Sequence, residues 1–147
     1  MSSTYTGIDP RLHKQLEADI NQLTRPIHMA VRRSIVTHPP LLDQLDAAAF
    51  PGRGTQGPER RTVPTSRPPL ALSAVDALLG IATELDQWRT RLTLPTAGTK
   101  RTLAAVPAAA QQLAPTIAEW LTLDVHNWWH TAAVQSGWRP EQLLRIR

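Results

Sequence analysis

The sequence contains no cysteine, and this absence excludes several kinds of site at once. Without thiols the chain can form no disulfide, no thiolate-bound zinc or iron–sulfur site, and no cysteine nucleophile. No apolar run approaches the roughly 18 residues that a membrane-spanning helix needs, so we expect no membrane association. Residues 1–7 have no basic region followed by an apolar one, so the sequence predicts no secretory signal.

Sequence motifs of catalysis are also missing. There is no Gly-x-Ser-x-Gly elbow and no Gly-x-x-x-x-Gly-Lys phosphate loop, and the spacing Gly-x-Gly-x-x-Gly occurs only at residues 52–57 (GRGTQG). The glycine-rich stretch 52–57 follows no predicted strand and opens no predicted helix, so it does not indicate a phosphate cradle. We therefore expect a non-enzymatic protein without a catalytic or cofactor site.

Three polar residues near the end of the chain raise the hypothesis of a metal site. Glu119, His126 and His130 share one face of a predicted helix, and the two histidines have the i, i+4 spacing of a metal pair. Glu119 lies two turns before His126, and no glutamate follows His126 as in the zinc proteases. An ordinary polar helix face explains these residues better, and we expect no metal.

Charged residues make up only 19% of the chain, and they are unevenly distributed. The net charge is +4 for 147 residues. Segments 1–50 and 71–100 are each neutral, whereas segment 51–70 carries a net +3. The arginines responsible are Arg53, Arg60, Arg61 and Arg67. These side chains could remain solvated, bind an acidic protein surface or follow a phosphate backbone, and we take them as a polar clamp on a protein partner.

Leucine periodicity and proline positions predict most of the helices. Leu12, Leu16, Ile20 and Leu23 mark one face of a helix over residues 10–24, with Asp9 and Pro10 at its start. The same reasoning predicts a second helix that starts from segment 37–40, with a buried stripe of Leu41, Leu42, Leu45, Ala48 and Ala49. It predicts further helices over 74–93, from Thr99 with a kink or break at Pro107, and over 115–136, with a last turn or two from Pro140. Ser73 and Asp76 have capping-box spacing, and Gly137 is placed to end the 115–136 helix.

Two stretches lack the pattern of a helix. Residues 27–37 contain β-branched residues and favour one short strand or an extended arm, since no second strand is evident to pair with it. Residues 51–71 are rich in proline, glycine and arginine, which predicts a long loop or linker. The fold class is therefore all-α, a small bundle of about five helices with an N-terminal segment 1–50, a linker 51–71 and a C-terminal bundle 72–147.

Tryptophan is concentrated near the end of the chain, with four of the five between residues 120 and 138. Apolar residues of the 115–136 helix cover two neighbouring faces, a wider arc than a single core contact needs. Either both faces pack inside the domain, or one is a protein-contact surface, where tryptophan is enriched. No basic residue interleaves with these rings, which disfavours base stacking. The candidate contacts are Trp128, Trp129 and Trp138.

Segments 36–45 (VTHPPLLDQL) and 128–138 (WWHTAAVQSGW), with the intervening Gly/Arg/Pro loop, carry a resemblance. The chain resembles a group of uncharacterised small proteins from actinobacterial phages and prophages, which share a leucine-rich start and a Trp-Trp…Gly-Trp ending. Many of those relatives carry a C-terminal cysteine cluster similar to a zinc ribbon, for which this chain has no ligands. The resemblance implies a phage source and no specific activity.

Taken together, these features predict a phage virion or assembly protein that acts through protein–protein contacts. By fold-level analogy a head–tail connector, with copies arranged in a ring, fits a helical subunit with an extended arm and a long linker. Its partners would be other virion proteins or copies of itself, in the virion or in the host cytoplasm during assembly. The alternative is a DNA-binding accessory protein of a phage or prophage.

Overall fold

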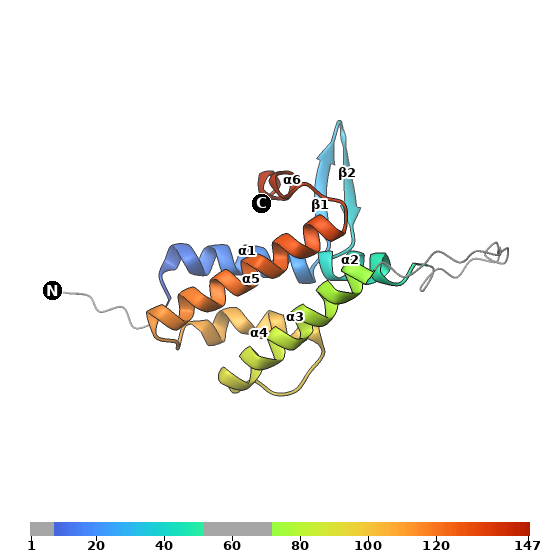
Figure 1. Cartoon of the computed structure of the whole chain (residues 1–147). Helices are drawn as coiled ribbons and strands as arrows, with labels where there is room; N and C mark the ends of the chain where they lie inside the picture. Colours follow the sequence, from blue (N-terminus) through green and yellow to red (C-terminus); the bar gives the residue numbers. More distant parts are fainter. Residues whose placement is uncertain (1–7, 52–71) are drawn as a thin grey trace.

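The computed structural model describes residues 8–51 and 72–147, which form six helices and one two-stranded sheet (Figure 1). The fold is thus mostly helical, as predicted, but it is not all-α. The elements in chain order are α1 (Pro10–Thr24), β1 (Ile27–Val31), β2 (Ser34–His38), α2 (Leu41–Ala49), α3 (Leu72–Arg91), α4 (Thr99–Ala110), α5 (Pro115–Gln135) and α6 (Pro140–Arg145). None of these helices is long and apolar enough to cross a membrane.

Local chemistry at the chain's prolines and at Gly137 sets several helix ends as predicted. The Asp9 carboxylate accepts a hydrogen bond from the Arg11 backbone N–H at 2.8 Å, with Pro10 in the first turn. Gly137 has a φ of +92°, in the region where side chains are disfavoured. Trp138 N–H donates to the Ala133 carbonyl at 2.9 Å, and Gly137 N–H donates to the Val134 carbonyl at 3.1 Å. These two bonds form the Schellman ending of α5.

Two helices differ from their predicted form. The capping box at Ser73 is wrong, because α3 already begins at Leu72 and the Ser73 hydroxyl donates instead to Gln135 Oε1 on α5, at 3.0 Å. Of the kink or break predicted at Pro107, the break is wrong, because α4 continues through this residue as one helix. Pro107 lies in the second half of α4, where it removes one backbone hydrogen bond. Its carbonyl lies 3.0 Å from His13 Nε2 on α1.

The prediction of a single strand or arm over 27–37 is wrong, since the segment folds on itself as a β-hairpin. β1 and β2 are antiparallel, in a register that runs from Ile27 opposite His38 to Val31 opposite Ser34. Arg32 and Arg33 form the two-residue turn, and Arg32 takes the left-handed backbone conformation, with a φ of +59°. Such turns normally use glycine or asparagine there, so no turn motif marked this hairpin in the sequence.

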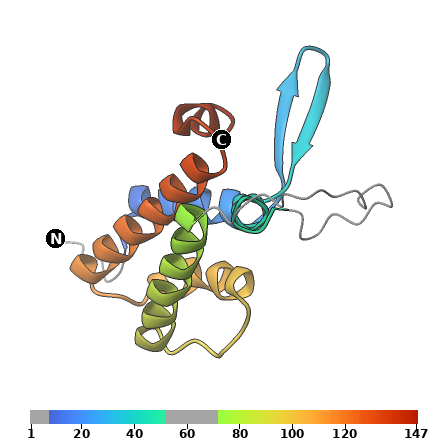
Figure 2. The same ribbon diagram turned by 45° about the vertical axis from the view of Figure 1, so that its right-hand side comes forward.

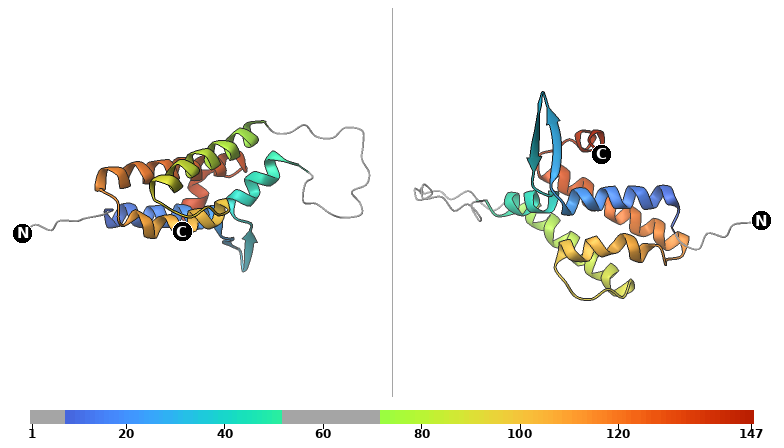
Figure 3. Two further views of the ribbon diagram at one scale, coloured as in Figure 1. Left: turned by 90° about the horizontal axis from the view of Figure 1, so that it is seen from below. Right: turned by 180° about the vertical axis from the view of Figure 1, so that it is seen from behind.

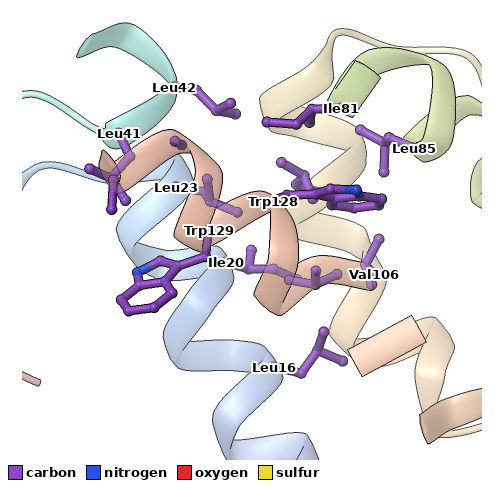
Figure 4. Close-up of a cluster of buried hydrophobic side chains, with 14 of the residues drawn as sticks. Leu16, Ile20, Leu23, Leu41, Leu42, Ile81, Leu85, Val106, Trp128 and Trp129 are labelled. Carbon is purple, nitrogen blue, oxygen red and sulfur yellow. The ribbon is translucent and has the colours of Figure 1, made fainter. Parts of the chain in front are cut away.

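One hydrophobic core joins the helices on both sides of residues 52–71. Helix α5 packs against α1, α2 and α3, and α4 packs against α1 and α3. Figure 4 shows side chains from five helices converging, among them Leu16, Ile20, Leu23, Leu41, Leu42, Ile81, Leu85, Val106, Trp128 and Trp129. The predicted N-terminal and C-terminal segments therefore contribute to the same core rather than forming two.

Candidate interaction surface

The β-hairpin projects from the helices (Figure 2). Its apolar side chains become more exposed toward the turn. On one face Ile27 is buried, Val36 is 39% exposed and Val31 is 44% exposed. On the opposite face Ile35 is 73% exposed, the most exposed large aliphatic side chain of the described residues. We call the exposed end of the hairpin, Val31–Val36, the hairpin tip.

The hairpin tip is also basic. Arg32 and Arg33 occupy the turn between Val31 and Ile35, and both are exposed. Residues 25–42 contain three arginines and no aspartate or glutamate. The tip thus presents β-branched side chains beside two guanidinium groups, and neither group forms an ion pair within the described part of the chain. Such a surface suits a partner that is both apolar and acidic.

The base of the hairpin is held by packing and hydrogen bonds. Ile27 joins the core, and the His38 ring meets the Trp138 ring edge-on at a centroid distance of 4.9 Å. Trp138 Nε1 donates to Gln44 Oε1 at 2.8 Å, and Gln44 Nε2 donates to the Pro39 carbonyl at 2.7 Å. Because these contacts join the hairpin base to α2 and to the end of α5, they orient the tip relative to the bundle.

The segment containing α6 lies beside the hairpin (Figure 3). It is anchored by a buried glutamine of α1, Gln22. Gln22 on α1 accepts a hydrogen bond from Trp129 Nε1 at 2.8 Å and donates to the Leu143 carbonyl at 2.9 Å. Leu143 itself is fully buried. One polar side chain thus connects α1, α5 and α6.

A charged network lies next to this glutamine. The fully buried Asp19 on α1 accepts hydrogen bonds from Arg147 and from His126 Nδ1, the latter at 3.0 Å. The Arg147 guanidinium lies 4.8 Å from the Trp129 ring centroid, and the His126 ring stacks on the same indole at 5.0 Å. Because the buried carboxylate has two partners, the arrangement explains how it is tolerated in the interior.

The network also includes one of the three residues predicted as a possible metal site, His126. His126 is held by Asp19, whereas Glu119 and His130 are exposed on the same helix. Across residues 8–51 and 72–147, no three His, Asp or Glu side chains lie where they could share a metal ion.

The predicted tryptophan surface is wrong for two of its three members. Trp128 and Trp129 are only 3% and 1% exposed, since α5 has neighbours on both of its apolar faces. Trp138 is half-buried at the hairpin base, where its ring contacts His38. The exposed indole is Trp120, at 53%, which the sequence did not single out as a contact.

The remaining predicted contacts, Arg53, Arg60, Arg61 and Arg67, lie outside the described residues. The hairpin tip is the surface that the sequence analysis missed. The β-branched residues 31, 35 and 36 did indicate extended structure. The turn between the two strands is Arg32-Arg33, which matches no common hairpin-turn sequence, so the sequence did not indicate that two strands pair.

Comparison with known proteins gives a family match over most of the chain. Residues 10–135 match the model of a family described as a domain of unknown function, DUF7341. No curated protein and no solved structure matches the chain. The family match spans α1 to the end of α5 and therefore includes the hairpin.

Proposed function

We propose that this chain, which belongs to the DUF7341 family of domains of unknown function, is a non-enzymatic assembly protein that binds another protein through its hairpin tip. The observation that carries the proposal is the exposure of apolar side chains on both faces of a projecting hairpin, above all Ile35 at 73%. Exposed apolar groups clustered on one projection are typical of protein contacts.

The energetics of a two-stranded hairpin support a partner. An isolated pair of strands is marginally stable in water, because neither face is covered. Burying one large aliphatic side chain contributes about 1.5–3 kcal/mol, so covering Val31, Ile35 and Val36 would stabilise the tip substantially. The rigid base made by Ile27 and Trp138 would present the tip in one orientation and reduce the entropy cost of binding.

Under this proposal the protein is a virion component of an actinobacterial phage or prophage, such as a head–tail connector, that works in the virion or in the host cytoplasm during assembly. The resemblance of segments 36–45 and 128–138 to phage proteins supports the source. The projecting hairpin supports the connector hypothesis by analogy, because subunits of assemblies commonly reach their neighbours with such arms.

The test compares two variants that each place a charge at an exposed apolar position. Ile35→Glu changes the hairpin tip, and Leu123→Glu changes an exposed leucine of α5, 60% exposed. We expect the native mass of the protein, alone and mixed with the structural proteins of the phage that encodes it, to show complexes that Ile35→Glu weakens and Leu123→Glu does not. Complexes unaffected by Ile35→Glu would contradict the proposal.

A second candidate, DNA binding, is favoured by the arginines at the same end of the molecule. Arg25, Arg32 and Arg33 occur without an acidic residue between positions 25 and 42, and Arg139 and Arg145 lie on the adjacent C-terminal segment. A duplex binder loses affinity with salt at a log–log slope of about −0.9 for each phosphate neutralised. Tight duplex binding whose salt slope becomes shallower on removal of Arg32 and Arg33 would favour this candidate over the first.

A further inference from the structure

A groove between α2 and α3 is apolar like the hairpin tip, but the helices around it carry excess negative charge where the tip carries positive charge. It encloses about 350 Å³ and is lined mainly by apolar side chains, Leu42, Phe50, Val75, Leu78, Leu79 and Ala82. Leu79 is 61% exposed along its edge, so the apolar surface continues beyond the groove. The groove is large enough for the side chains of a hairpin turn rather than for a single methyl group.

The helices that form the groove are acidic. Helices α2 and α3 carry five carboxylates, Asp43, Asp46, Asp76, Glu84 and Asp86, against two arginines at the end of α3, Arg89 and Arg91, and so have a net charge of −3. Asp43 and Lys100 both line the groove and pair with each other at 2.9 Å, so their charges offset and the excess negative charge lies on the rest of α2 and α3. An apolar floor with an acidic surround is thus the complement of an apolar tip with two arginines.

The hairpin tip cannot fill the groove of its own chain. The strands lead away from α2 and from the bundle in every view (Figures 1–3). A strand of five residues extends about 17 Å, which places the turn far from the groove at the hairpin base. A contact between tip and groove therefore requires two copies of the chain.

We propose that the hairpin tip of one copy docks into the α2–α3 groove of a second copy. This inference rests on the proposed function and names its partner. Ile35 enters the apolar groove, while Arg32 and Arg33 at the turn face carboxylates of α2 and α3, with Asp76 exposed on α3. Two different surfaces meet, so the contact is heterologous and repeats from copy to copy, as in a ring or a filament.

The absence of cysteine makes disulfide trapping a direct test, because each introduced thiol is the only one in its chain. Ile35→Cys and Leu79→Cys are purified separately, mixed and oxidised mildly. We expect a covalent dimer in the mixture well above the level in either protein alone. Ile35→Cys mixed with Leu123→Cys is the matched control, since Leu123 is as exposed as Leu79 but lies on α5.

Self-association gives an independent readout that needs no cross-link. We expect Ile35→Glu and Leu79→Glu each to weaken self-association of the otherwise unchanged protein at least tenfold, and Leu123→Glu to leave it within about twofold. Far-ultraviolet circular dichroism of each variant checks that the helices remain folded.

The outcomes separate this inference from the proposed function. If Ile35→Cys cross-linked to Leu123→Cys, or mainly formed disulfide dimers with other Ile35→Cys molecules, the groove would not be the docking site. The hairpin tip would still be a protein contact. A protein that stays monomeric at all concentrations would also overturn the inference, and the proposed function would then depend on binding to a different virion protein. If Ile35→Glu changed no complex of either kind, both would fail.

Discussion

The indole nitrogen of Trp88 on α3 donates a hydrogen bond to Asp124 Oδ2 on α5 at 2.7 Å. The roles are exchanged one turn away, where Trp128 Nε1 on α5 donates to Glu84 Oε1 on α3 at 2.6 Å. Each helix thus supplies one tryptophan and one carboxylate, four residues apart. The two bonds fix the register of α3 against α5 and satisfy both indoles at the edge of the core.

Removing one acceptor of this pair should destabilise the protein measurably. Asp124→Ala leaves the N–H of the 6%-exposed Trp88 without its partner, which costs about 1–3 kcal/mol of unfolding free energy. Asp124→Asn keeps an acceptor and should lose less. Asp86→Ala is the control, because Asp86 forms an exposed ion pair with Arg89, and such pairs contribute about 0–1 kcal/mol. Urea denaturation measures all three, and equal losses for Asp124→Ala and Asp86→Ala would contradict this role.

Two glycines should respond to the same substitution with opposite signs. Gly80 lies inside α3 with nothing within 4 Å of an added Cβ, so Gly80→Ala should stabilise the protein by about 0.4–1 kcal/mol. Gly137 has equal space but a φ of +92°, so Gly137→Ala should destabilise by about 1 kcal/mol or more. Thermal unfolding separates the two, and a stabilising Gly137→Ala would mean that the end of α5 can take another conformation.

The buried Asp19 predicts a strong dependence on Arg147. Arg147→Ala leaves the fully buried carboxylate with His126 as its remaining hydrogen-bond partner, and we expect a loss of about 3 kcal/mol, the low end for breaking a buried pair. Arg145→Ala is the matched control, because Arg145 is exposed two residues earlier in the chain. Denaturant unfolding at neutral pH measures both. Similar losses for the two variants would show that the network adds little stability.

Local chemistry made parts of the fold predictable from the sequence. Asp9 with Pro10, Pro115 and Gly137 each set a helix end through their own backbone or side chain, and the structure confirms all of them. Ser73 shows the limit of such reasoning, since its hydroxyl is engaged by Gln135, 62 residues away. A long-range partner of this kind leaves no local pattern.

The candidate site was harder to predict, because it depends on what surrounds each residue. Trp128 and Trp129 have the composition of a contact surface, yet the neighbours of α5 on both sides bury them. Conversely, Ile35 looks like an ordinary strand residue, and only the absence of a covering element among the described residues exposes it. Amphipathic patterns show which faces are apolar, but not which of them other elements cover.

The turn residue Arg32 offers a variant that separates backbone geometry from charge. Its φ of +59° costs a non-glycine residue about 1 kcal/mol, so Arg32→Gly should keep the hairpin and leave the unfolding free energy unchanged or up to about 1 kcal/mol higher. Arg32→Val should lower it, because a β-branched residue fits that conformation poorly. Denaturant unfolding of the two variants measures both effects, and a clear destabilisation by Arg32→Gly would contradict this role of the backbone.

The charge removed by Arg32→Gly then distinguishes the two candidate functions. If the tip docks on carboxylates of a second copy, self-association should weaken and become less sensitive to salt, since the interface then holds one guanidinium fewer. If the tip instead follows a duplex, the log–log salt slope of DNA binding should become less negative by about 0.9, because one phosphate is no longer neutralised. Fluorescence anisotropy with labelled duplex and sedimentation of the protein alone measure these effects side by side, with Arg33→Ala as the companion variant. A variant that changes neither readout would remove Arg32 from both proposals and leave the apolar residues Val31 and Ile35 as the determinants of the tip.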